Sequence, residues 1–164
     1  MTIRFGILTL SDRSAKGERA DASGPALVEI IQRHNWSVVK QAILPDDESA
    51  ICAVLIEWAD GGEADVILTT GGTGFSQRDI TPEATRAIIQ REAPGLAETM
   101  RAESLKKTPH AMLSRAVAGI RGSTLIVNLP GSPMGAVENL QTILPVLPHA
   151  VQLLTNDPES EASH

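Results

Sequence analysis

The chain has 164 residues, of which 42% are hydrophobic and 21% are charged, and its formal net charge is −6. This length and composition are typical of one globular domain with a full hydrophobic core. The acidic balance argues against non-specific binding to nucleic acid or to an anionic membrane, because both need a basic face, and an aromatic content of 2% leaves few rings for base stacking.

No apolar run reaches the length of a membrane span, and the first residues show no signal-peptide pattern, so we expect a cytoplasmic protein. Cys52 is the only cysteine, which excludes a disulfide within the chain and a thiolate metal cluster. Its apolar helical surroundings predict a small core residue. The four histidines lack the spacing of metal ligands, and we expect them to be structural or at the surface.

The first part of the chain alternates between apolar runs and amphipathic segments. The apolar run over residues 3–10 predicts a strand that is covered on both faces, and residues 64–70 predict a buried strand. Residues 36–43 predict a further strand between them. Two helices should connect them. Ser23 can cap the first, which has Pro25 near its first turn, and the second should end near residue 58, before Gly61 and Gly62.

The remainder of the chain is mostly helical. Thr81-Pro82-Glu83 predicts a helix start, because Thr can cap it, Pro suits the first turn and Glu faces the positive end of the dipole. Pro94-Gly95 should end that helix. We expect further helices over 96–107, 111–117, 133–144 and 150–154, and a strand over 123–129. Residues 1–154 form the single predicted domain, and residues 155–164 are expected to be a disordered acidic tail.

The alternation of strands and helices predicts an α/β fold, a three-layer sandwich with a mainly parallel central sheet flanked by helices. In such sheets, ligands bind beyond the carboxyl ends of the strands. Four loops should meet at that edge, and they carry all the unusual motifs of the chain. These loops are residues 11–17, 44–47, 71–79 and 130–133.

The most informative loop is Thr69-Thr70-Gly71-Gly72-Thr73-Gly74, directly after the third predicted strand. Its glycines let the backbone approach a ligand closely and turn N–H groups outward, which suits a phosphate. The loop lacks the Gly-Lys-Ser/Thr of a P-loop, and the first strand is not followed by a dinucleotide fingerprint. A plain strand-to-helix turn is the alternative interpretation.

Asp46 and Asp79 follow different strands but should project over the same sheet edge. Two carboxylates can hold Mg²⁺, which in turn neutralises a triphosphate. Arg13, Lys16 and Arg78 are the cations best placed to meet phosphate. The alternative is that both acids are turn residues and that the cations are solvated loop charges.

These motifs resemble a known family. Leu68 to Gly74, Arg78-Asp79-x-Thr81-Pro82-Glu83-Ala84, Ser114-Arg115 and Leu129-Pro130-Gly131-Ser132 are similar to motifs of the molybdopterin adenylyltransferases, which include the MogA/MoaB group and the N-terminal domain of gephyrin. The resemblance extends from about residue 3 to residue 154. It implies a role in molybdenum cofactor biosynthesis, in which the terminal phosphate of molybdopterin attacks the α-phosphorus of Mg-ATP, pyrophosphate is released and adenylylated molybdopterin forms.

The resemblance also implies roles for individual residues. Asp46 and Asp79 would hold Mg²⁺ and act in catalysis. The residues that would bind the two substrates are Ser11, Asp12, Gly71, Gly72, Thr73, Gly74, Arg78, Pro130, Gly131 and Ser132. Many relatives carry a basic residue after the Pro-Gly-Ser segment, whereas Pro133-Met134-Gly135 supplies none, so the phosphate contacts shift to Arg13, Lys16 and Arg78.

The family further implies a homotrimer and a separate molybdenum-insertion enzyme as a partner. Two other functions remain open at this point. One is a molybdopterin-binding or scaffold module without catalysis, and the other is a nucleotide pyrophosphate hydrolase. The intact Asp46 and Asp79 favour the transferase over the scaffold.

Overall fold

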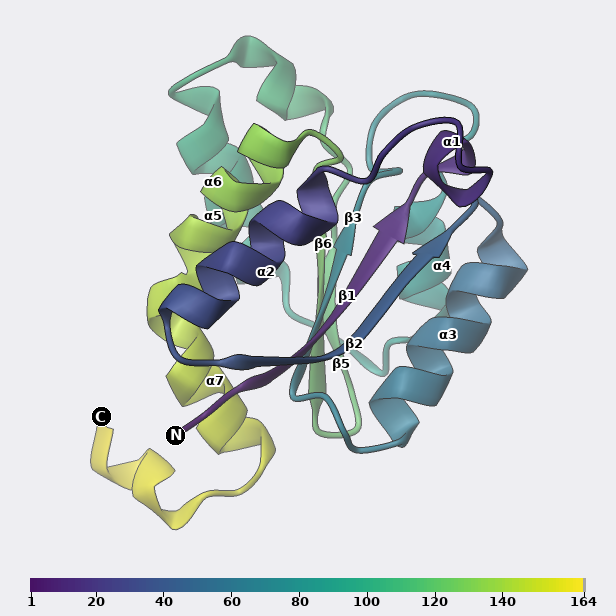
Figure 1. Cartoon of the computed structure of the whole chain (residues 1–164). Coiled ribbons are helices and arrows are strands. Elements are labelled where there is room, and N and C mark those ends of the chain that lie inside the picture. The colour runs from purple at the N-terminus through teal and green to yellow at the C-terminus, as the bar shows by residue number, and fades with distance from the viewer. Residues whose placement is uncertain (164) are drawn as a thin grey trace.

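A twisted six-stranded sheet forms the centre of the computed structural model, which describes residues 1–163 (Figure 1). The strands are β1 (Arg4–Leu10), β2 (Ser37–Leu44), β3 (Val66–Thr70), β4 (Arg91–Glu92), β5 (Ala118–Arg121) and β6 (Thr124–Leu129). Their order across the sheet is β2-β1-β3-β6-β5-β4. The first four in this order are parallel, whereas β5 and β4 are antiparallel to their neighbours.

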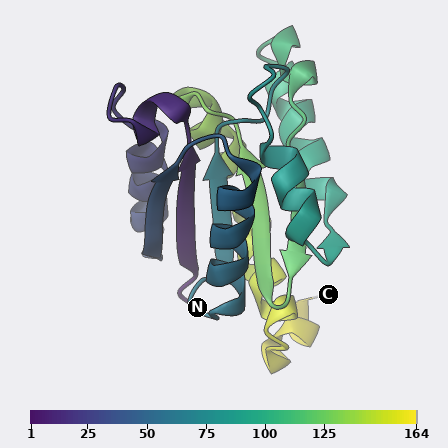
Figure 2. The same ribbon diagram turned by 90° about the vertical axis from the view of Figure 1, so that its right-hand side faces the viewer.

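Helices cover both faces of the sheet, as Figure 2 shows in a view turned by 90°. The α-helices are α1 (Asp12–Ala15), α2 (Ser23–Arg33), α3 (Glu48–Asp60), α4 (Thr81–Ile88), α5 (Pro94–Leu105), α6 (Pro133–Ile143) and α7 (Leu147–Leu154). Shorter 3-10 helices are η1 (Pro109–Leu113), η2 (Leu144–Val146) and η3 (Pro158–Ser163). The predicted three-layer α/β fold with a mainly parallel sheet is therefore confirmed.

The core divides into two apolar clusters, one on each face of the sheet. Alternate residues of a strand point to opposite faces, so Ile7 packs toward α2, α5, α6 and α7, while its neighbour Leu8 packs toward α3 and α4. Leu68 and Ile67 of β3 divide in the same way. All four side chains are fully buried. This two-sided burial explains why the central strands are continuous apolar runs.

Two capping predictions were wrong. Ser23 does not cap α2, whose N-cap is Ala22; the Asp21 carboxylate instead accepts the Gly24 N–H at 3.0 Å. Thr81 does not cap α4 either, because it is already helical. The Thr81 hydroxyl donates to the carbonyl of Gly71 at 2.9 Å and so ties α4 to the glycine loop.

Residues 111–117 were predicted to be a helix, but only residues 111–113 are helical, as the end of η1. After η1 the chain is extended, and the N–H of Arg115 donates to the carbonyl of Thr73 at 2.8 Å. The chain then enters β5, which, like the two-residue β4, the sequence did not predict. Pro94 begins α5, whereas the prediction placed it only at the end of a helix; α4 already ends at Ile88.

Cys52 packs against the cluster beneath α3 and α4, but its side chain is only half-buried, and its Sγ donates to the carbonyl of Ala84 at 3.4 Å. Within the described residues, none of the helices is both long and apolar enough to cross a bilayer. The predicted acidic tail contains η3, and His164 lies outside the described residues. Disorder of this tail stays a prediction.

Candidate active site

The carboxyl ends of β1, β2, β3 and β6 lie at one edge of the sheet, and the loops that follow them contact one another there. The N–H of Ser11 donates to the carbonyl of Leu44 at 3.0 Å, which joins the first two loops. The N–H of Gly71 donates to the carbonyl of Leu129 at 3.1 Å. The Thr70 hydroxyl donates to the carbonyl of Pro130 at 2.7 Å. The predicted convergence of four loops is therefore present.

The glycine loop turns sharply as it leaves β3. Gly71 and Gly72 have φ angles of +107° and +67°, in the region that favours glycine. A Cβ on Gly72 would lie 2.3 Å from the Thr81 hydroxyl and 3.1 Å from Asp46 Oδ1. A Cβ on Gly71 would lie 2.3 Å from the carbonyl oxygen of Leu10. Glycine is thus required here by close packing within the site as well as by the backbone conformation.

Asp46 and Asp12 bind each other through their main chains and side chains. The N–H of Asp46 donates to Asp12 Oδ1 at 2.9 Å, and the N–H of Asp12 donates to Asp46 Oδ2 at 3.2 Å. The remaining oxygen of Asp46, Oδ1, is buried and has no hydrogen-bond partner. Burial raises the pKa of the Asp46 carboxyl, and the nearby charges of Asp12 and Asp79 add to the increase.

Asp79 lies in the loop before α4 and borders the same cavity as Asp46. Its Oδ2 accepts the N–H of Ser76 at 3.0 Å, so the carboxylate is held close to its own loop. Both acids are half-buried. Of the two carboxylates, that of Asp46 has an oxygen, Oδ1, that is buried without a hydrogen-bond partner in the described chain.

This cavity, which we call the acidic cavity, has a volume of about 370 Å³. Its acidic lining residues are Asp21, Asp46 and Asp79, and Arg19 is the cation among its lining residues. Of the predicted substrate-binding residues, it includes Ser11, Gly71, Gly72, Gly131 and Ser132.

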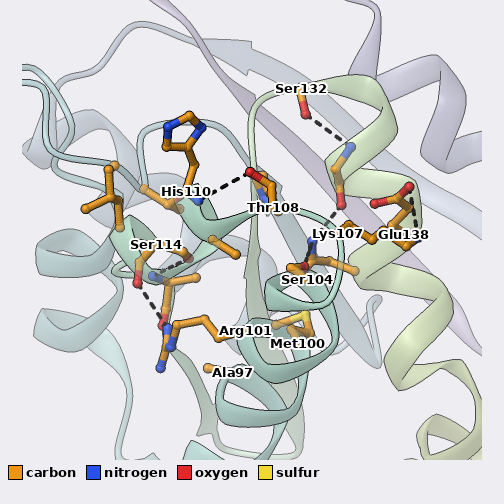
Figure 3. Close-up of a pocket in the computed structure, with 18 residues that line it drawn as sticks. Ala97, Met100, Arg101, Ser104, Lys107, Thr108, His110, Ser114, Ser132 and Glu138 are labelled. Atoms are coloured by element: carbon orange, nitrogen blue, oxygen red, sulfur yellow. Dashed lines mark hydrogen bonds and ion pairs between the residues drawn. The ribbon is translucent and has the colours of Figure 1, made fainter.

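A second cavity, of about 330 Å³, lies between α5, η1 and α6 (Figure 3). We call it the α5–α6 cavity. Thr73, Gly74 and Pro130 border it, and Ser132 borders both cavities. Lys107 and Glu138 form an ion pair of 3.0 Å among its lining residues. The glycine loop and the Pro-Gly-Ser loop therefore stand between two cavities and contribute residues to each.

The predicted phosphate-binding cations are placed differently from our expectation. Arg78 donates from Nε and Nη2 to the two carboxylate oxygens of Asp12, both at 2.9 Å. This pairing lowers the pKa of the Asp12 carboxyl. Arg13, in α1, and Lys16, at the C-cap of that helix, are both exposed and border neither cavity. Arg19, which borders the acidic cavity, was missed because no motif in the sequence marks it.

Arg115 is a second residue whose role the sequence did not reveal. Its guanidinium donates to the carbonyl of Gly74 at 2.7 Å, to that of Asp79 at 2.8 Å and to the Glu83 carboxylate at 2.8 Å. The Ser114-Arg115 motif marked this residue in the sequence, but the motif did not indicate what Arg115 contacts. Arg115 ties the glycine loop to the start of α4.

The histidines are dispersed. His34 stacks on Trp36 with a ring-centroid separation of 5.2 Å, and His110 borders the α5–α6 cavity. Among residues 1–163, no three His, Cys, Asp or Glu side chains are grouped so as to hold a metal ion. The carboxylates of Asp46 and Asp79 nevertheless suit Mg²⁺, because this ion commonly binds one or two carboxylates and completes its shell with substrate phosphates and water. The unpartnered Oδ1 of Asp46 is an available ligand atom.

Comparisons with known proteins match nearly the whole chain. Residues 6–149 match the family model described as a probable molybdopterin binding domain. Among curated proteins, the molybdopterin adenylyltransferase of Helicobacter pylori is 43% identical over 155 residues, which cover 93% of this chain and 88% of that protein. The molybdenum cofactor synthesis protein cinnamon of Drosophila melanogaster is 47% identical over 158 residues, but the chain spans only 26% of its length.

Solved structures of other proteins also match more than nine-tenths of this chain. The molybdopterin biosynthesis enzyme MoaB from Thermus thermophilus has a TM-score of 0.90 and 53% identity, with 96% of this chain and 99% of that chain covered. The tungsten cofactor synthesizing protein MoaB from Pyrococcus furiosus has a TM-score of 0.84 and 37% identity, with 93% and 97% covered.

Proposed function

Since the chain belongs to the family of molybdopterin-binding domains, we propose that it is a molybdopterin adenylyltransferase of molybdenum cofactor biosynthesis. In this reaction the terminal phosphate oxygen of molybdopterin attacks the α-phosphorus of ATP. The bond between the α-phosphorus and the oxygen that bridges to the β-phosphorus breaks, and pyrophosphate leaves. The observation that carries the proposal is the buried, unpartnered Asp46 Oδ1, which faces the glycine loop in the cavity that Asp79 also borders.

Asp46 and Asp79 are the residues that would hold Mg²⁺. A bound Mg²⁺ would offset the charge of the triphosphate and of the pyrophosphate that leaves. The protein then has mainly to position two anionic substrates and balance their charge. A half-buried pair of carboxylates suits that task. Burial and, to a lesser extent, the neighbouring carboxylates raise the pKa of Asp46, and a bound cation would stabilise its ionised form.

The two cavities suit the two substrates. We propose that the triphosphate occupies the acidic cavity and that the pterin occupies the α5–α6 cavity. The phosphate that becomes the bridge would then lie near Ser132, which borders both. Ser132 also caps α6, since its hydroxyl accepts the Gly135 N–H at 3.1 Å, and the positive end of this helix favours an anion there.

The assembly and the next step in the pathway are also proposals. We propose a homotrimer, in line with the family resemblance, and transfer of the product to a separate molybdenum-insertion enzyme. Sedimentation analysis of the purified chain tests the assembly, with a mass three times the 17.4 kDa of one chain as the expected result.

The test of the activity is pyrophosphate release from Mg-ATP with and without molybdopterin. The transferase predicts pyrophosphate and adenylylated pterin together, and only when molybdopterin is present. Release of pyrophosphate without molybdopterin would favour the hydrolase. Molybdopterin binding without any product above a protein-free control would favour the scaffold.

A further inference from the structure

Three loops of the site are joined by one chain of polar contacts, Arg78 to Asp12 to Asp46. Arg78 comes from the loop after β3, Asp12 from the start of α1, which follows β1, and Asp46 from the loop after β2. Arg78 contacts both oxygens of Asp12. Asp12 Oδ1 also accepts the N–H of Asp46 at 2.9 Å. These contacts therefore end at the main chain of Asp46, the residue whose Oδ1 has no hydrogen-bond partner.

The geometry fixes Asp46 at two points. Its main chain is held by the Asp12 carboxylate, and its side chain is held by the Asp12 N–H, which occupies Oδ2. Rotation of the Asp46 carboxylate would break the second contact, so Oδ1 stays on the side of the glycine loop, 3.1 Å from where a Gly72 Cβ would be. The Asp12 carboxylate can hold the main chain of Asp46 only while its own orientation is fixed.

Arg78 supplies that orientation. A guanidinium can donate two parallel hydrogen bonds to one carboxylate, which a lysine ammonium cannot reproduce. Two of its nitrogens are committed to Asp12, and the residue does not border either cavity. Arg78 is therefore poorly placed to bind substrate phosphate. Its guanidinium instead binds the carboxylate of Asp12.

We propose that Arg78 and Asp12 are positioning residues, which act through their mutual pair to orient Asp46 toward the metal–nucleotide complex. This inference rests on the proposed function for the identity of the ligand. It replaces the expectation that Arg78 and Asp12 contact substrate directly. Residues that orient a metal ligand typically change metal affinity or activity by 10-fold to 100-fold when they are replaced.

Steady-state kinetics distinguish positioning from phosphate binding. Arg78→Ala should lower kcat by about tenfold, while KM for ATP and for molybdopterin stays within about twofold of wild type. The matched control is Arg33→Ala, because Arg33 is also paired with a carboxylate, Glu29, and its side chain is 67% exposed, against 64% for Arg78. A rise in KM with unchanged kcat would overturn the proposal, since it would indicate direct contact with substrate.

Charge-conserving variants separate geometry from electrostatics. Arg78→Lys and Asp12→Glu keep every charge but disrupt the paired hydrogen bonds. Each should weaken Mn²⁺ binding in the presence of α,β-methylene-ATP by about tenfold, as measured by electron paramagnetic resonance, whereas Arg33→Lys should not. Wild-type affinity in Arg78→Lys would contradict positioning, because charge alone would then suffice. This readout needs no turnover, so it tests the inference even if the adenylylation assay fails.

The double variant Arg78→Lys/Asp12→Glu gives a further check. If the two residues act through one pair, the Mn²⁺ affinity of the double variant should lie within about twofold of that of the more weakly binding single variant. Losses that multiply, to about 100-fold, would show that the two residues act independently and would overturn the proposed pair.

Discussion

Arg115 holds Asp79 by its main chain, with Nη2 donating to the Asp79 carbonyl at 2.8 Å. The same guanidinium reaches Gly74 and Glu83, so one side chain connects the glycine loop, the acid and the start of α4. The Asp79 carboxylate in turn accepts the Ser76 N–H, so both the main chain and the side chain of Asp79 are held by hydrogen bonds. The position of one proposed catalytic acid depends on a residue 36 positions away in the sequence.

Replacement of Arg115 by Met should release that arrangement. We expect kcat to fall by about tenfold and the free energy of unfolding to fall by about 1–3 kcal/mol, because carbonyl groups at the loop lose their donors. Kinetics and urea unfolding measure the two effects. Arg91→Met, at an exposed arginine of β4, is the control. Wild-type kcat and stability in Arg115→Met would show that the loop holds itself.

Gly72→Ala should be more destabilising than Gly17→Ala. Both glycines have positive φ, +67° and +74°, so the backbone strain of about 1 kcal/mol is shared. A Cβ at Gly17 meets nothing within 4 Å, whereas one at Gly72 meets the buried Thr81 hydroxyl at 2.3 Å. We expect an additional loss of about 1–3 kcal/mol at Gly72, measured by urea unfolding. Equal losses at the two positions would contradict the packing at this loop.

Asp46→Asn should make the protein more stable at neutral pH and much less active. The folded state raises the pKa of this carboxyl, mainly through burial, so the native protein binds the proton more readily than the unfolded chain does. The free energy of unfolding therefore falls as the pH rises from the pKa of the unfolded chain, about 3.9, through the raised pKa of the folded state. Above that range, the ionised Asp46 carboxylate destabilises the folded protein.

Denaturant unfolding at pH 7 and near pH 3.5 measures this difference. The Asn variant should be more stable than wild type at pH 7, and the gap should close at the lower pH, where the Asp46 side chain of the wild type is mostly neutral. Turnover at pH 7 should fall by on the order of 10²-fold, because a metal ligand is removed. A less stable Asn variant with unchanged turnover would show that Asp46 is a structural turn residue.

We expect Arg19, and not Arg13 or Lys16, to be the cation that contacts the triphosphate. Arg19→Ala should raise KM for ATP by about tenfold, as expected for the loss of one charge-assisted hydrogen bond worth about 1.5 kcal/mol. KM for ATP should stay near wild type in Arg13→Ala and Lys16→Ala, because neither residue borders the acidic cavity or the α5–α6 cavity. If Arg13→Ala weakened ATP binding more than Arg19→Ala, the charge balance assigned to the acidic cavity would be wrong.

The sequence predicted the sheet edge well and the side-chain contacts poorly. Asp46 and Asp79 could be placed at one site because each follows a predicted strand, and parallel strands end at the same edge of a sheet. The Arg78–Asp12 pair could not be predicted, because 66 positions separate its members and either residue could have remained in solvent. The α5–α6 cavity was also missed, since residues such as Ala97 and Met100 read only as one face of a helix.

Local errors have equally physical causes. Ser23 and Asp21 are both good capping residues two positions apart, and only the path of the loop selects Asp21. Strand β4 has two exposed residues, too few to produce an alternating pattern, and its existence depends on pairing with β5.

The most direct test of the central claim is to follow the α-phosphorus of ATP. ATP labelled at that atom is incubated with the protein, Mg²⁺ and molybdopterin, and a parallel reaction uses ATP labelled at the γ-phosphorus. We predict that the α-label appears in the pterin product and the γ-label in pyrophosphate, in equal amounts. The γ-label in the pterin would identify a kinase, and the α-label in free AMP would identify a hydrolase; either result would contradict adenylyl transfer.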